Sequence, residues 1–330
     1  MANEIKYVMT TAEFAELTGE PETEVIKRFD HKKLLDLNRK KVGIPSEVLR
    51  EDLAKRGFHY SFKVVAHINM RGGIGKTTST ITVASRAFQY GFRTCILDLD
   101  PQGSSSMAFG TLPEEGAPIF YDIWQNPSAT LMPSLKAIED NLYILPSSLE
   151  NGLLDLSLIN PSAQKKAVHG VCAELKTNGF DLVMIDCPPS LGTAVISTIC
   201  AADIIVIPVC SDPFSFKGLE LTLNEITSIC ETFHLERPAI RILCTKFDRR
   251  ERISIDALEK LSNLYGDYFV PTVIRTSTEF SKAIARKETV FASLRRNSAR
   301  DDYDMYVRHL LELNNIFKKG NAYGQEKENP

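Results

Sequence analysis

A strand that runs into a glycine-rich turn and then into a helix is the feature that most constrains this chain. Residues 63–69, KVVAHIN, form an apolar run typical of a buried strand, and residues 70–78, MRGGIGKTT, follow at once. The next segment places apolar residues on one helical face and stops at Gly91. This order predicts a phosphate-binding loop, in which the N-terminus of a helix points at an anion.

The residue types in the loop suit a nucleoside triphosphate bound with magnesium. Glycines let backbone N–H groups curl around phosphate oxygens, because no Cβ stands in the way. Lys76 supplies a point charge for the outer phosphates, and the Thr77 hydroxyl is placed to bind Mg²⁺. We expect the nucleotide to contact residues 71–78, which are Arg71, Gly72, Gly73, Ile74, Gly75, Lys76, Thr77 and Thr78.

Acidic residues end two further apolar strands. Asp98 and Asp100 close the run 93–100, and Asp186 closes the run 180–188. An acid at the end of a buried strand beside a phosphate-binding loop holds a water of the Mg²⁺ shell, which is the role expected for Asp186.

The rest of the chain after residue 62 alternates apolar strands with longer helical segments. This pattern predicts an α/β fold with a mostly parallel sheet covered by helices on both faces, the fold class of P-loop NTPases. The expected strands are residues 63–69, 93–100, 141–146, 180–188, 203–209 and 239–247.

The first 60 residues differ from the rest of the chain in their residue pattern, which predicts a small, separate module. Thr11 is expected to cap a helix that Gly19 ends, a second helix starts near Thr23, and residues 34–44 look like two strands around a polar turn at 38–41. This order is that of a winged helix-turn-helix, which predicts DNA contact through Lys27 and Arg28. The open alternative is a helical hairpin that only packs on the main domain.

The expected domains are therefore a helix-turn-helix-like module at 1–60, an ATPase domain at 61–318 and a disordered tail at 319–330.

The net charge of the chain limits how it can bind nucleic acid. The net charge is −3 and the pI is about 6.1, so contact with DNA must come from local basic patches. Two basic stretches, 245–252 and 275–300, supply the remaining candidates, Arg249, Arg250, Arg275, Arg286, Arg295 and Arg296. No run approaches the roughly 20 apolar residues that cross a bilayer, and the start lacks the apolar core of a signal peptide, which predicts a cytoplasmic protein.

The motifs together resemble those of the ParA and MinD superfamily. The strict Walker A pattern fails at Met70, whereas the deviant form KGGxGK(S/T) fits, with Arg71 in place of the family's signature lysine. The runs 96–106, ILDLDPQGSSS, and 182–192, LVMIDCPPSLG, are similar to the segments that follow in ParA-type partition ATPases. The likeness spans about residues 63–316, and the first 60 residues resemble the operator-binding modules of larger ParA proteins.

The resemblance implies a reaction cycle and its partners. ATP binding brings two subunits face to face, the dimer binds nonspecific DNA on the nucleoid, and a ParB-like centromere-binding protein stimulates hydrolysis. The implied cofactors are ATP and Mg²⁺, and no membrane partner is expected. The implied roles are Lys76 and Thr77 on phosphate and metal, Asp100 orienting the attacking water, Asp98 as a second acid near the metal, Asp186 in the Mg²⁺ shell, and Arg71 acting across the dimer.

Other interpretations stay open at this stage. Residues 245–248, Thr-Lys-Phe-Asp, fit the pattern with which related GTPases read guanine, so Asp248 is a candidate for contact with the base, although ATP is preferred. A MinD-like positioning ATPase would anchor its last helix, expected at 303–320, on a membrane. A transcriptional regulator would use the N-terminal module on an operator under the control of ATP.

Overall fold

The structure is a computed structural model that describes residues 6–37 and 41–317. The tip of the expected wing, residues 38–40, and the expected disordered tail at 319–330 lie outside the described residues.

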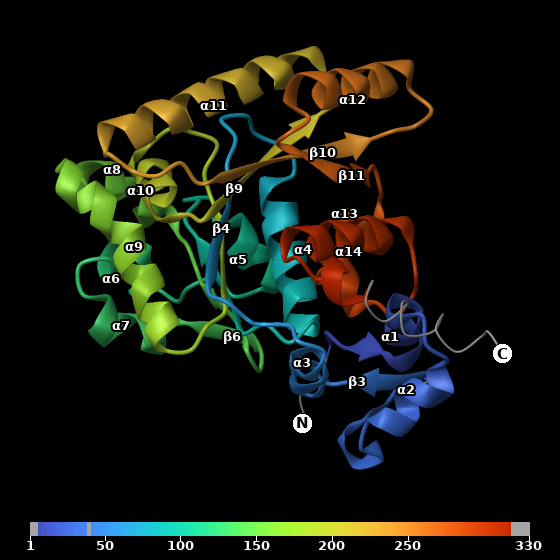
Figure 1. The fold of residues 1–330 in the computed structure, drawn as a ribbon. Coiled ribbons are helices and arrows are strands. Elements are labelled where there is room, and N and C mark those ends of the chain that lie inside the picture. Colours follow the sequence, from blue (N-terminus) through green and yellow to red (C-terminus); the bar gives the residue numbers. More distant parts are fainter. Residues whose placement is uncertain (1–5, 38–40, 318–330) are drawn as a thin grey trace.

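An eight-stranded sheet forms the centre of the molecule (Figure 1), with the strand order β11-β10-β9-β4-β8-β5-β7-β6. Neighbouring strands are parallel except at one edge, where β6 runs antiparallel to β7. The carboxyl ends of the parallel strands therefore all lie along the same side of the sheet, the carboxyl edge. The strands are β4 Lys63–His67, β5 Thr94–Asp98, β6 Lys136–Glu139, β7 Leu142–Leu145, β8 Leu182–Asp186, β9 Ile204–Cys210, β10 Ala239–Phe247 and β11 Phe269–Arg275.

Helices cover both faces of this sheet, as the sequence predicted. Alternate strand residues point to opposite faces, so Val65 and Met184 belong to one apolar core, and Ala66 and Ile185 to the other. The main-domain helices are α4 Lys76–Gln89, α5 Ser104–Phe109, α6 Phe120–Ile123, α7 Pro127–Ser134, α8 Leu154–Ser157, α9 Pro161–Thr177, α10 Thr193–Ala201, α11 Pro213–Thr232, α12 Arg252–Tyr265, α13 Glu279–Ala285 and α14 Ser298–Leu310, with short 3₁₀ turns η2 Leu149–Leu153 and η3 Val290–Ala292.

All six expected strands of the main domain are present, and two strands were not expected. β6 is a four-residue edge strand whose side chains are mostly half-buried, so it has little apolar pattern. β11 contains Pro271, which cannot donate to a ladder and which edge strands tolerate. The expected helix 303–320 also differs, since α14 runs from Ser298 to Leu310, a turn follows at 311–313 and helical residues resume at 314–317, while 318–320 lie outside the described residues.

The N-terminal residues form a small unit with its own three-stranded sheet. Two short helices, α1 Thr11–Thr18 and α2 Glu22–Arg28, precede the antiparallel pair β2 Leu35–Leu37 and β3 Lys41–Ile44. Strand β1, Met9–Thr10, pairs with β3, and η1 His31–Lys33 and α3 Ser46–Lys55 complete the unit. The helix pair and the hairpin agree with the sequence, whereas β1 and α3 were not foreseen.

The cap of α1 differs from the expectation by one residue. The Thr10 side chain accepts a hydrogen bond from the Glu13 backbone N–H at 3.1 Å, so Thr10 is the cap and Thr11 is the first helical residue. Gly19 ends the helix in the left-handed region at φ 71°, as expected.

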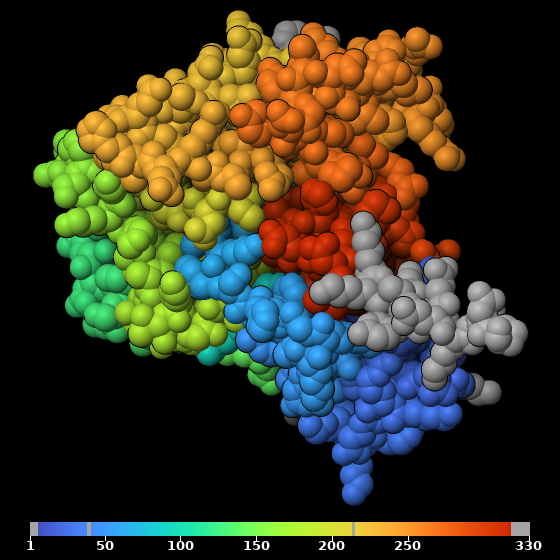
Figure 2. Space-filling model, viewed as in Figure 1, coloured from blue at the N-terminus to red at the C-terminus, as the bar shows by residue number. Residues whose placement is uncertain are grey.

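The N-terminal unit packs against the end of α4 that is far from the glycine-rich loop. In Figure 2 this unit, coloured blue, lies beside the red C-terminal residues and away from the gold and orange α11 and α12. One continuous apolar core contains Phe14 and Leu49 from the unit and Ala87 and Tyr306 from the main domain. The two parts therefore share a core instead of being joined by a tether.

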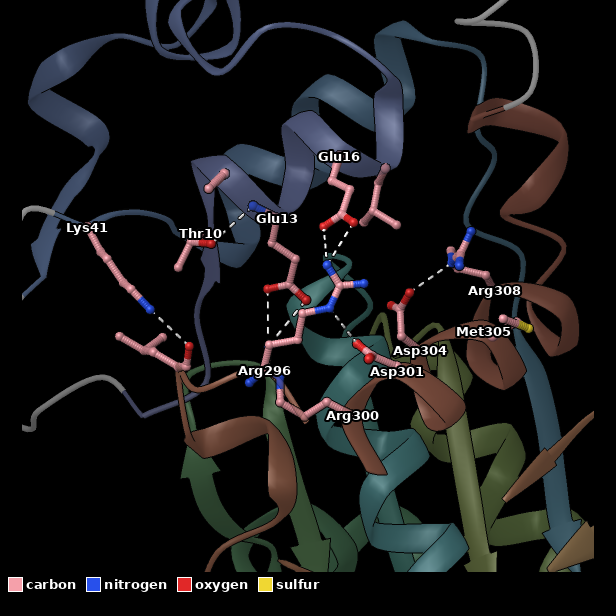
Figure 3. A pocket seen from close by; sticks show the side chains of 13 residues that line it. Thr10, Glu13, Glu16, Lys41, Arg296, Arg300, Asp301, Asp304, Met305 and Arg308 are labelled. Atoms are coloured by element: carbon pink, nitrogen blue, oxygen red, sulfur yellow. Dashed lines mark hydrogen bonds and ion pairs between the residues drawn. The ribbon is translucent and has the colours of Figure 1, made fainter. Parts of the chain in front are cut away.

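Ion pairs complete this interface, and Figure 3 shows those made by Glu16 and Asp304. The Arg86 side chain on α4 is fully buried and pairs with Asp304 on α14 at 2.5 Å and with Glu13 on α1 at 2.8 Å. Arg300 also pairs with Glu13, at 3.1 Å, and Arg296 pairs with Glu16 at 2.7 Å. Glu13 thus offsets buried positive charge of the main domain, since it pairs with both Arg86 and Arg300.

Because of this arrangement, α4 is not the simple amphipathic helix that the sequence predicted. Its polar side is buried as well, because α14 and the N-terminal unit cover it. The Ser79 hydroxyl lies 2.8 Å from the Tyr303 hydroxyl, and Thr80 lies 3.0 Å from the ring of the buried His67.

The interface predicts a large effect of one substitution. Asp304→Asn leaves Arg86 without its nearest compensating charge inside the protein, so we expect the free energy of unfolding to fall by about 3–5 kcal/mol. Chemical denaturation of the full chain measures this difference. The control Asp256→Asn breaks the exposed pair with Arg252, where at most about 1 kcal/mol is expected. Equal effects of the two substitutions would contradict the buried-charge account.

Candidate nucleotide-binding site

The glycine-rich loop joins β4 to α4 at the carboxyl edge of the sheet. Gly73 and Gly75 have φ values of 73° and 97°, a backbone conformation that glycine adopts without strain, and α4 begins at Lys76 directly after Gly75. The Lys76 ammonium is buried and donates hydrogen bonds to the carbonyl oxygens of Asn69 at 3.0 Å and Arg71 at 2.9 Å. Burial lowers the pKa of Lys76, and the nearby carboxylate of Asp186 opposes this shift.

Two buried carboxyl groups stand side by side beneath this loop. Asp98 and Asp186 are partners in the register of β5 and β8, and neither is exposed. The Ser106 hydroxyl donates to Asp98 Oδ2 at 2.6 Å, and the Ser105 hydroxyl donates to Asp186 Oδ2 at 2.8 Å. Burial, reinforced by the charge of a neighbouring aspartate, raises the pKa of both carboxyl groups.

One oxygen of each acid has no hydrogen-bond partner. Asp98 Oδ1 and Asp186 Oδ1 are both buried and unsatisfied. A cation with its water shell would supply what these two oxygens lack, and Thr77 is near enough to Asp186 to lower the pKa of its carboxyl group. The residues present therefore fit Mg²⁺ at this position.

Within residues 6–37 and 41–317, no group of three or more His, Cys, Asp or Glu side chains could hold a metal alone. Proteins bind Mg²⁺ through one or two carboxylates together with the phosphates of a nucleotide.

Asp100 lies two residues beyond the strand end, in a tight turn. Its Oδ1 accepts from the Gln102 backbone N–H at 2.9 Å, and its carbonyl oxygen accepts from the Gly103 backbone N–H at 2.8 Å and from the Ser147 hydroxyl at 2.7 Å. The residue is 9% exposed, so its side chain is close to the surface of the site. The structure places Asp98, Asp100 and Asp186 at the same edge as the loop.

Arg71 is bound within its own subunit. Its Nη1 lies 2.5 Å from Asp212 Oδ1 and 2.8 Å from the Ser215 hydroxyl, and its backbone N–H donates to the Asn69 side chain. The Arg71 side chain is still 40% exposed. Hydrogen bonding and the positive charge of Arg71 keep the pKa of Asp212 below its usual value despite partial desolvation.

The carboxyl end of β10 and the residues that follow it lie against the other side of the loop. The Thr245 hydroxyl donates to the Ile74 carbonyl oxygen at 2.8 Å, which ties this segment to the glycine-rich turn. The Asp248 carboxylate accepts from the Arg250 backbone N–H at 3.0 Å and pairs with the Arg250 guanidinium at 2.6 Å. Hydrogen bonds from Arg250 lower the pKa of Asp248 to about 2. Both oxygens of this carboxylate bond Arg250, unlike those of an aspartate that is free to accept hydrogen bonds from a guanine base.

The candidate DNA-binding residues fall into two classes. Six of them are tied to acids: Lys27 to Glu24, Arg28 to Glu20, Arg250 to Asp248, Arg275 to Asp302, Arg286 to Glu288, and Arg296 to Glu16. Arg249 and Arg295 are exposed, and the structure shows no ion pair for either within its described ranges. These two are the most available to a phosphate.

Sequence reasoning missed several polar residues that support the site. Ser105, Ser106, Ser147 and Asn151 are all buried, and they hold the acids or the turn that carries Asp100. A signal was present, because Ser147 directly follows an apolar strand at the edge where the acids lie.

Comparison with known proteins now decides the family. A family described as AAA domain, AAA_31, matches residues 62–242, more than half of the chain and the part that contains the loop and the three acids. The chain belongs to this AAA domain family.

Two individual relatives and one solved structure are similar to this chain over most of its length. Within the AAA domain family, the chain is 25% identical to the cell division protein PomZ of Myxococcus xanthus over 85% of this chain and 88% of PomZ. It is 28% identical to the sporulation initiation inhibitor protein Soj of Bacillus subtilis over 67% of this chain and 87% of Soj. A cobyrinic acid a,c-diamide synthase of Mycobacterium smegmatis, solved with an ATP analogue and magnesium, superimposes with a TM-score of 0.63 at 22% identity over 76% of this chain and 95% of that one, a likeness of fold alone.

These findings confirm the resemblance to ParA-type ATPases of partitioning and positioning that the motifs indicated. The predicted enzyme class, an ATPase, and the predicted cofactors, ATP and Mg²⁺, agree with them and with the buried acids described above.

Proposed function

We propose that this AAA domain protein is an ATP-dependent DNA-partition ATPase. It hydrolyses ATP to ADP and phosphate, dimerises on ATP, binds nonspecific DNA and responds to a ParB-like partner protein. The observation that supports this most strongly is the convergence of a deviant phosphate-binding loop with the three acids Asp98, Asp100 and Asp186 at one edge of the sheet. A further relative, the chromosome-partitioning ATPase Soj of Treponema pallidum, is 26% identical over 67% of the chain.

The proposed roles follow from the positions of the side chains. Lys76 and the backbone N–H groups of residues 72–78 bind the phosphates, while Thr77, Asp186 and Asp98 face the metal. Magnesium, when bound, neutralises charge that develops on the phosphates. Asp100 orients the attacking water, and Asp248 lies on the segment expected to border the base.

Arg71 is proposed to act across the dimer, where the family has a lysine. Its pairing with Asp212 and Ser215 keeps the guanidinium beside its own loop, and breaking one partly exposed ion pair has a small energetic cost. A guanidinium can bind two phosphate oxygens at once through its planar fork.

Replacement of this side chain tests the assignment. We expect Arg71→Ala to bind ATP nearly as well as wild type, because Lys76 and the loop backbone remain, but to lose ATP-dependent dimerisation. Light scattering coupled to size-exclusion chromatography measures the dimer, and fluorescent ATP measures binding. An Arg71→Ala protein that dimerises and hydrolyses ATP like wild type would remove Arg71 from this role.

DNA binding is proposed to use Arg249 and Arg295. Arg249 follows the carboxyl end of β10, the edge at which the nucleotide site lies, and both side chains are exposed. Contact with phosphates by such residues releases counterions, so binding weakens steeply with salt.

Removal of the two arginines, compared with removal of an exposed arginine elsewhere, tests this surface. In fluorescence anisotropy with duplex DNA of random sequence and ATP, the double variant Arg249→Ala, Arg295→Ala should bind more weakly and reduce the slope of log K against log salt by about 2, roughly one for each lost contact. Arg237→Ala is the control, because Arg237 is exposed just before the amino end of β10. Binding that is indifferent to ATP, or to the double substitution, would refute the proposal.

The N-terminal unit supports a second role on an operator, which coexists with partition. Its two helices and hairpin have the order of a winged helix-turn-helix, and Lys27 is exposed on α2. Arg28 is a weaker candidate for DNA contact, because Glu20 and Asp52 surround it.

A MinD-like anchor on a membrane is less well supported. Leu310, Leu313 and Phe317 from the expected anchor face are buried in the core. Separately from such an anchor, which would lie in the membrane surface, no helix in the described ranges is long and apolar enough to cross a bilayer.

A further inference from the structure

A buried polar network connects the turn that carries Asp100 to the segment after β7. The Ser147 hydroxyl donates to the Asp100 carbonyl oxygen at 2.7 Å and accepts from the Asn151 side-chain amide at 2.7 Å. Ser147 and Asn151 are both buried, with exposed fractions of 0% and 2%. Because these groups are desolvated, each hydrogen bond fixes the geometry of its partner strongly.

Ser147 also connects to the second acid of the site. Its backbone N–H donates to the Ser106 hydroxyl at 3.0 Å, and that hydroxyl donates to Asp98 Oδ2 at 2.6 Å. One residue therefore contacts, directly or through Ser106, both acids of the segment Asp98–Asp100.

The far side of the network is also fixed. The Asn151 side-chain oxygen accepts from the Tyr121 backbone N–H at 3.0 Å, so the amide cannot turn away from Ser147 without losing a bond. The turn itself is closely packed, since a Cβ at Gly103 would lie 3.0 Å from the Ser147 carbonyl oxygen. The position of Asp100 thus depends on Ser147 from a neighbouring strand end.

We propose that Ser147, held by Asn151, is a positioning residue that sets the direction of the Asp100 side chain for the attacking water. This rests on the proposed ATPase function and on the role of Asp100 within it. Ser147 touches neither nucleotide nor water in this assignment and acts only through the backbone of Asp100. Small errors in the position of a catalytic group have large effects on rate, which is why such a bond matters.

A double-substitution cycle on the full chain tests the proposal. Ser147→Ala should lower kcat for ATP about ten-fold or more, the usual effect of losing a group that orients a catalytic residue, while ATP affinity measured with fluorescent ATP changes less than about two-fold. In an Asp100→Asn background, Ser147→Ala should cause no further loss, because the residue through which it acts is already disabled.

Two further variants separate positioning from general stability. Ser197→Ala is the matched control, since Ser197 is also fully buried and its hydroxyl also bonds a backbone group, the N–H of Val168 at 3.0 Å. It should leave kcat unchanged. Asn151→Leu removes the donor to Ser147 at similar size and should lower kcat in the same direction, which keeps the test valid if Ser147→Ala does not fold.

The outcomes distinguish this proposal from the function on which it rests. Equal losses from Ser147→Ala in the wild-type and Asp100→Asn backgrounds, or a wild-type kcat in Ser147→Ala, would overturn the positioning role alone. A wild-type kcat in Asp100→Asn would overturn the role of Asp100 and the positioning role together. Absence of ATP hydrolysis by the wild-type protein would instead refute the proposed function.

Discussion

The burial of Asp98 and Asp186 next to each other is the constraint on which the rest of the site depends. Two carboxylates at the paired ends of β5 and β8 repel each other in a medium that solvates them poorly. Two serine hydroxyls at the start of α5 satisfy one oxygen of each acid and leave the other oxygen without a partner. A divalent cation would offset both the repulsion and the missing hydrogen bonds, which is why we propose that this pair binds a metal.

The residues around this acid pair fix the positions of the groups that would bind the nucleotide. Lys76 begins α4 near Asp186, whose charge acts on the Lys76 ammonium, and α4 is fixed along its length, by Tyr303 near the loop and by Arg86 at the far end. The N-terminal unit takes part through Glu13, because it supplies charge that the buried Arg86 requires. Helix α4 and its partners therefore connect the nucleotide loop to the N-terminal unit, which is proposed to contact an operator.

Much of this site could be predicted from local sequence, and the exceptions have physical reasons. The loop at residues 71–78 and the acids at strand ends are encoded by short runs, so their positions followed from the strand pattern. Ser147 and Asn151 were missed because their role depends on which strands are neighbours, and β5 lies beside β7 only in the folded sheet. The burial of polar residues on α4 was missed for the same reason, since α14 and the N-terminal unit cover it. The ion pair between Arg71 and Asp212 was missed because it joins two loops whose paths the sequence does not specify.

The most direct test of this account is the affinity for ATP with and without Mg²⁺, measured by isothermal titration calorimetry on wild type and on Asp186→Asn. If the unsatisfied carboxylate oxygens form a metal site, Mg²⁺ strengthens ATP binding to wild type by about ten-fold or more and strengthens binding to Asp186→Asn far less. An equal effect of Mg²⁺ on both proteins, or no effect on either, would contradict the central claim that this buried acid pair is built around a cation.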